Sequence, residues 1–111
     1  MTIDEFHNIE MKVGTILSAE VIEGADKLLK LSVDFGEGEP RQILSGIREF
    51  YAPEDIVGKQ CPFVTNLEPR TIRGLQSNGM ILAVGPVDES GKRGCVLLHP
   101  DKEVATGSKL G

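Results

Sequence analysis

The chain has 111 residues, of which 40% are hydrophobic and 26% are charged, as in an ordinary globular domain. Its net charge of −5 argues against a polyanion binder that works through a lysine-coated surface. The first residues lack the basic start and apolar core of a signal peptide, and no apolar run approaches the ~20 residues that span a bilayer. We therefore expect a cytoplasmic protein without membrane contact, folded as one domain over residues 1–111.

The hydrophobic pattern predicts short strands separated by turns rich in glycine and proline. A turn or helical lead-in over 3–9 comes first, and the clearest strand is 29–35, where apolar and polar residues alternate. A short helix is predicted over 52–58, because Pro53 suits a first helical turn and Gly58 can end it. Further strands are expected at 13–21, 41–44, 60–65, 80–84 and 95–98. Short strands with one small helix between the third and the fourth are typical of an all-β, five-stranded OB-fold barrel, here with terminal extensions.

The reactive residue types do not form a catalytic or metal-binding pattern. Cys61 and Cys95 lie far apart in apolar segments, so we expect reduced, buried thiols. His7 and His99 are isolated, and the sequence contains no paired-ligand spacing, dinucleotide fingerprint or Walker A loop. We expect no cofactor, no metal and no catalytic residue, and hence a protein that binds.

The most informative segment is the polar run over 66–80, which reads NLEPRTIRGLQSNGM. Arg70 and Arg73 can hold phosphates through their guanidinium groups, although two solvated loop arginines are the simpler interpretation. Asn66 and Ser77 suit a ribose hydroxyl or a phosphate, but both residue types are also common in turns. Met80 can touch a base face, or it can be the first core residue of a strand.

This run resembles the NLxPxxxxGxxSxGM signature of the tRNA-binding OB domain family. That domain occurs at the C-terminus of many methionyl-tRNA synthetases and in free-standing structure-specific tRNA-binding proteins. Other segments are similar to further family blocks in the same order: KVGTI at 12–16, GADKL at 24–28, PRQILSGI at 40–47 and LHPDKEV at 98–104.

The resemblance implies a non-catalytic module that recognises the outer corner of folded tRNA and supports methionyl-tRNA synthetase-type aminoacylation, as a domain, subunit or partner of a synthetase. It places a lysine of the GADKL turn on the same basic face as the polar run, with neighbouring surface from the PRQILSGI block. The residues expected to bind tRNA are Lys27, Arg41, Ser45, Asn66, Arg70, Arg73, Ser77 and Met80.

The same family contains a CsaA-type branch of dimeric chaperones for unfolded preproteins, which is the alternative function. That branch departs from the SxGM pattern, whereas this chain keeps it at 77–80. The family is generally homodimeric through its terminal segments, which implies a homodimer here. The candidate contacts are Phe6, Ile9, Val96 and Leu97, and the alternative is that these residues plug the ends of a monomeric barrel.

Overall fold

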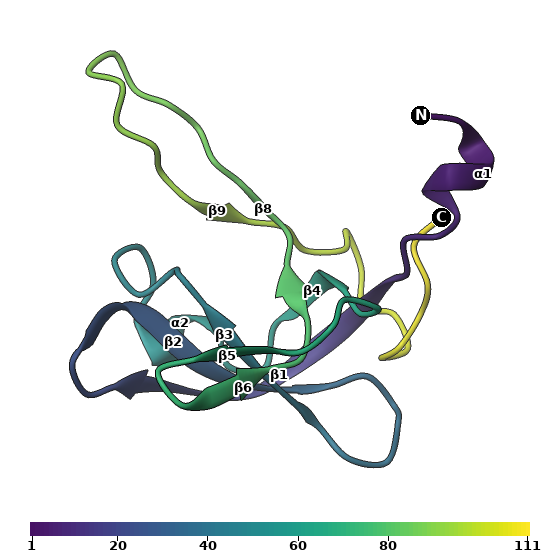
Figure 1. Cartoon of the computed structure of the whole chain (residues 1–111), viewed down its shortest axis with the longest axis horizontal. Helices are drawn as coiled ribbons and strands as arrows, with labels where there is room; N and C mark the ends of the chain where they lie inside the picture. Colours follow the sequence, from purple (N-terminus) through teal and green to yellow (C-terminus); the bar gives the residue numbers. More distant parts are fainter.

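The computed structural model describes residues 1–111 as one central antiparallel sheet with two separate hairpins (Figure 1). In chain order the elements are α1 (Ile3–Phe6), β1 (Met11–Ile22), β2 (Ala25–Asp34), β3 (Arg41–Ser45), α2 (Pro53–Ile56), β4 (Gln60–Val64), β5 (Arg70–Ile72), β6 (Leu75–Ser77), β7 (Met80–Ile81), β8 (Ala83–Val84) and β9 (Val96–Leu97). The predicted all-β class is confirmed, as is a short helix between the third and the fourth strand.

The central sheet has the strand order β3-β2-β1-β4-β7. The long strand β1 lies in its middle, paired with β2 on one side and β4 on the other. Along β2, Leu29, Leu31 and Val33 are at most 1% exposed, which confirms the alternation predicted from the sequence. These side chains pack with Phe35 and Phe63, whose rings meet edge to face with centroids 5.3 Å apart, and they form the core.

The expected barrel is not closed by a strand ladder, because β3 and β7 lie at opposite edges of the sheet and do not pair. The gap between β3 and the segment before β7 is bridged by single contacts. Asn78 N–H donates to the Gln42 carbonyl at 2.8 Å, and the Gln42 side chain donates to the Gln76 carbonyl at 2.9 Å. The sheet is therefore held in a curled form by single hydrogen bonds between β3 and the segment over 76–78 rather than by a closing strand pair.

The segment predicted as a long polar loop contains a β-hairpin. β5 and β6 pair through Arg70↔Ser77 and Ile72↔Leu75, which leaves Arg73 and Gly74 as a two-residue turn. Both turn residues have positive φ angles, 51° and 77°, as a type I′ turn requires. The pattern concealed this hairpin because each strand is only three residues long and largely polar.

The expected strand over 80–84 is divided at Leu82, whose N–H donates to the Pro62 carbonyl at 3.0 Å. Its second part, β8, pairs with β9 instead, and the segment between them forms a hairpin that extends away from the sheet (Figure 1). At the other end of the molecule the C-terminal segment lies along β1. Ser108 accepts a backbone hydrogen bond from Val13 at 2.9 Å, so the two termini are neighbours.

Candidate nucleic-acid interface

The β5–β6 hairpin carries the two arginines of the polar run at its surface. Arg70 begins β5, and Arg73 occupies the turn; both are exposed. The Arg73 Nη1 atom lies 3.8 Å from the place where a side chain at Gly24 would begin, so Arg73 reaches the β1–β2 turn. Lys27, exposed on β2, follows that turn. The hairpin therefore brings a positive group from the polar run to the GADKL segment.

A pocket of about 390 Å³ opens beside the hairpin. It is lined by Leu44, Ser45, Gly46, Leu67, Glu68, Arg70, Ser77, Gly79, Met80 and Ile81, and we refer to it as the Met80 pocket. Met80 is 47% exposed although it begins β7, so its thioether remains accessible. Four predicted site residues thus border one concave surface that combines apolar walls with a guanidinium group, the combination that suits a base and its phosphate.

The two serines of this pocket are buried, contrary to the expectation that position 77 lies in a solvated polar loop. The Ser77 hydroxyl accepts a hydrogen bond from Leu44 N–H at 3.0 Å and faces the Gly79 carbonyl at 3.4 Å. Ser77 therefore joins β6 to β3. The Ser45 hydroxyl is buried without any hydrogen-bond partner, and it is the one buried side-chain polar atom in the chain of which this is true.

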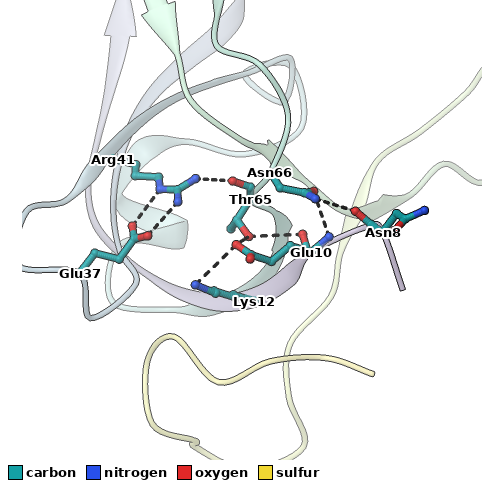
Figure 2. A network of polar contacts seen from close by, with 7 residues as sticks. All are labelled: Asn8, Glu10, Lys12, Glu37, Arg41, Thr65 and Asn66. Atoms are coloured by element: carbon teal, nitrogen blue, oxygen red, sulfur yellow. Dashed lines mark hydrogen bonds and ion pairs between the residues drawn. The ribbon is translucent and has the colours of Figure 1, made fainter. Parts of the chain in front are cut away.

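Arg41 is already engaged within the protein (Figure 2). Its Nε and Nη2 atoms donate to the two carboxylate oxygens of Glu37, each at 2.8 Å, and Nη1 donates to the Thr65 carbonyl at 2.6 Å. Its guanidinium lies 5.4 Å from the centroid of the Phe35 ring. The hydrogen bond from Arg41 holds the pKa of Glu37 below the ordinary glutamate value of 4.5. The contacts with Glu37 hold the β2–β3 loop to β3, and the contact with Thr65 joins β3 to the end of β4.

Asn66 belongs to the same polar network (Figure 2). Its side-chain oxygen accepts from Glu10 N–H at 2.9 Å, and its side-chain nitrogen donates to the Asn8 carbonyl at 2.7 Å. Next to it the Thr65 hydroxyl donates to the Glu10 carboxylate at 2.7 Å, which lowers the pKa of Glu10. The amide of Asn66 therefore fixes the N-terminal segment to the end of β4.

The five arginines fall into two groups, according to whether the guanidinium group makes polar contacts within the protein. Arg41 is paired as described, and Arg48 donates to the Ala25 carbonyl at 3.0 Å, where it locks the β1–β2 turn. The guanidinium groups of Arg70, Arg73 and Arg93 make no hydrogen bond or ion pair inside the protein. Three guanidinium groups are thus free for a ligand, on a chain whose net charge is negative.

The cysteines and histidines give no sign of reactivity. Both cysteines are free thiols, Cys61 fully buried and Cys95 partly so, and burial raises the pKa of Cys61 to about 11. His99 Nδ1 lies 2.7 Å from the Gln60 carbonyl. Acidic, histidine and cysteine side chains form no group of three that could hold a metal ion. Neither helix has the length and apolar character needed to cross a membrane.

Fold and site together define an all-β binding domain with a free basic hairpin beside an apolar pocket. The sequence matches the family described as "Putative tRNA binding domain" over residues 11–109. The chain belongs to this tRNA-binding domain family, and it is a tRNA-binding module. The resemblance found in the sequence is thereby confirmed.

Curated relatives of the chain include methionine–tRNA ligases of archaea. The chain is 51% identical over 104 residues to the ligase of Methanothrix thermoacetophila, covering 94% of this chain and 14% of that protein. It is 45% identical over 109 residues to the ligase of Methanococcoides burtonii, covering 97% of this chain and 15% of that protein. The chain therefore spans about one seventh of the length of these relatives.

Similar solved structures span the whole chain. A MetRS-related protein from Pyrococcus horikoshii superimposes with a TM-score of 0.88 at 39% identity, covering 100% of this chain and 97% of that one. The chaperone CsaA from Bacillus anthracis gives a TM-score of 0.83 at 32% identity, covering 100% and 98% of the two chains. The MetRS-related protein and the CsaA chaperone thus both share the fold of this chain.

Proposed function

We propose that this domain recognises the outer corner of folded tRNA and supports a methionyl-tRNA synthetase-type aminoacylation in the cytoplasm. The observation that carries the proposal is the free arginine pair, Arg70 and Arg73, on a hairpin that borders the Met80 pocket. The methionine–tRNA ligase relatives support the link to a synthetase, either as one of its domains or as a separate partner.

The predicted site residues take different parts in this proposal. Arg70 and Arg73 bind phosphates, Lys27 adds charge from β2, and Met80 contacts a base or ribose face. Ser45 and Ser77 shape the wall of the pocket from inside. Arg41 and Asn66 act through the polar network of Figure 2, where they hold the segments around the site in place.

The test compares three RNAs in a filter-binding experiment: folded tRNAs of several specificities, one of these tRNAs unfolded, and a linear RNA of equal length. We expect similar affinities for the folded tRNAs and much weaker binding of the linear RNA, because a few contacts on a rigid surface select for shape. Equal affinity for all three would contradict recognition of tRNA shape.

We also propose that the domain forms a homodimer. Ile9 is 41% exposed and Val96 is 49% exposed, so both offer apolar surface to a second copy, and Phe6, three residues before Ile9, is half-buried. Leu97, the fourth candidate, is only 6% exposed and belongs to the core, so it contributes to packing instead. Light scattering should give about twice the 12.0 kDa chain mass, and a monomer at every workable concentration would remove this proposal.

A CsaA-like chaperone activity is the second candidate, favoured by the superposition on the Bacillus anthracis protein. The retained SxGM residues at 77–80 favour tRNA instead. An aggregation assay with an unfolded protein, run with and without tRNA, distinguishes the two functions. Suppression of aggregation by the domain, with no measurable tRNA binding, would establish the chaperone reading.

A further inference from the structure

Two further hollows continue the Met80 pocket toward the β8–β9 hairpin. The inner hollow, of about 270 Å³, is lined by Gly46, Phe50, Ala83, Val84, Gly85, Arg93, Gly94 and Cys95. The outer hollow, of about 370 Å³, is lined by Phe50, Pro86, Val87, Asp88, Lys92, Arg93 and Gly94. Gly46 borders both the Met80 pocket and the inner hollow, and the inner and outer hollows also share lining residues, so the three cavities adjoin one another from the β5–β6 hairpin to the β8–β9 hairpin.

Phe50 and Arg93 border both hollows, and neither side chain makes a hydrogen bond or an ion pair within the protein. Phe50 is 41% exposed, so much of its ring gains no free energy from burial in the folded domain. The guanidinium of Arg93 makes no hydrogen bond or ion pair within the chain. An aromatic ring and a free guanidinium along one groove are the two groups that bind an unstacked nucleotide, through its base and its phosphate.

Both groups are held in place rather than left on mobile chain. The Tyr51 hydroxyl, next to Phe50, accepts a hydrogen bond from Leu97 N–H at 3.1 Å, and this fixes the turn that carries Phe50 to β9. Arg93 forms an isolated β-bridge with Val87, and its side chain lies over Gly85, where an added Cβ would overlap the Nε atom. The absence of a side chain at Gly85 is what lets the guanidinium lie across the hairpin.

The charged residues that line the two hollows are Asp88, Lys92 and Arg93. Asp88 borders the outer hollow, but its carboxylate accepts hydrogen bonds from the Ser90 hydroxyl at 2.6 Å and from the N–H groups of Ser90 and Lys92. These contacts lower the pKa of Asp88 and therefore favour its charged form. Lys92 and Arg93 outnumber Asp88 in the lining of the outer hollow, so this lining keeps one net positive charge.

We propose that the tRNA-binding surface extends over this groove, where Phe50 stacks on one unpaired base and Arg93 binds an adjacent phosphate. The inference rests on the proposed tRNA-binding function and adds a second contact region to it. The partner is identified by charge complementarity to a phosphate backbone and by continuity with the Met80 pocket. Because stacking needs an unpaired base, the region reads an exposed nucleotide of the folded tRNA rather than a helical stem.

The test measures tRNA affinity for Phe50→Leu and Arg93→Gln, each compared with Lys102→Gln. Leucine keeps the apolar bulk but removes the aromatic face, and we expect affinity to fall roughly fivefold or more. Arg93→Gln should weaken binding about tenfold and reduce the salt dependence by about one phosphate contact. Lys102→Gln loses the same charge from an exposed position outside all three hollows, and should leave affinity within about twofold.

Gly85→Ala adds a test of geometry. The new methyl group must displace the Arg93 side chain, which is flexible enough to move without disturbing the fold. We expect Gly85→Ala to weaken binding to a similar extent as Arg93→Gln, and the double variant to bind no worse than Arg93→Gln alone. Additive losses, or no loss from Gly85→Ala, would contradict the assigned position of the guanidinium.

The outcomes separate this inference from the function on which it rests. If the unaltered protein binds no tRNA, the proposed function fails and this inference falls with it. If it binds tRNA and both Phe50→Leu and Arg93→Gln bind equally well, only this inference is wrong. Light scattering is also run on each variant. A changed mass with unaltered tRNA affinity per protomer would assign Phe50 and the exposed valines of the β8–β9 hairpin (Val84, Val87 and Val96) to a protein contact instead.

Discussion

The Ser77 hydroxyl and the Leu44 N–H form a buried hydrogen bond of 3.0 Å that joins the β5–β6 hairpin to the edge of the central sheet. Since β3 and β7 do not pair, this bond is one of the few polar links across the open side of the sheet. The position of Arg70 and Arg73 relative to the pocket therefore depends on a serine that is itself 4% exposed.

Ser77→Ala should destabilise the fold. The substitution leaves the buried Leu44 N–H without an acceptor, which costs about 1–3 kcal/mol in the free energy of unfolding. Urea unfolding measures the loss. Thr71→Ala, at an exposed position of the same hairpin, is the matched control and should stay within about 0.5 kcal/mol of the unaltered protein. Equal stability of Ser77→Ala and the unaltered protein would refute the assigned role.

Arg73→Asn should separate binding from stability. Arginine at this position adopts a φ of 51°, which asparagine tolerates better, so the free energy of unfolding should stay the same or rise by up to about 1 kcal/mol. Affinity for tRNA should fall about tenfold, because a charge-assisted contact is lost. Arg73→Lys keeps the charge without the planar fork and should recover part of the affinity. Full-strength binding by Arg73→Asn would place the tRNA on another face.

Asn66→Ala should lower stability by about 1–2 kcal/mol, since it removes both hydrogen bonds that hold the N-terminal segment. Asn8→Ala is a matched control, because Asn8 contributes only its backbone carbonyl and the acceptor survives the change. Thermal unfolding of both variants measures the difference. Equal melting temperatures for the two variants would mean that the Asn66 amide does not stabilise the fold.

Acid should weaken the link between β3 and the β2–β3 loop. Arg41 depresses the pKa of Glu37, so the carboxylate is favoured in the folded state. Its contribution is fully present above the ordinary glutamate value of 4.5 and is lost as the pH falls through the depressed value. Unfolding free energies measured from pH 7 downward should therefore decline less steeply below about pH 4.5 in Glu37→Gln than in the unaltered protein. Parallel curves would contradict the coupling.

Much of the fold follows from the sequence because β2 alternates strictly and because turns marked by glycine and proline divide the strands. The β5–β6 hairpin was missed for a physical reason. Its turn has Arg73 before Gly74, whereas the sequence pattern that predicts a type I′ turn is asparagine or aspartate before glycine. The open sheet was also unpredictable, since strand closure depends on contacts between residues far apart in the chain.

The candidate site was predicted in outline, but the tasks of its residues were not. Residue type alone cannot distinguish Arg41, which has every nitrogen engaged, from Arg73, which has none. The difference lies in Glu37 and Thr65, whose positions depend on the fold. Phe50 and Arg93 escaped the sequence analysis for a similar reason, because nothing local links the turn after β3 to the β8–β9 hairpin.

The placement of the two chain ends has a consequence for how this domain can be joined to other proteins. Leu110 N–H donates to the Met11 carbonyl at 3.0 Å, so both ends leave from one corner of the molecule (Figure 1). The β5–β6 and β8–β9 hairpins lie away from that corner. A tether attached at either end therefore reaches the same side of the domain and leaves the two hairpins uncovered, so a fusion at either end need not block the surface between them.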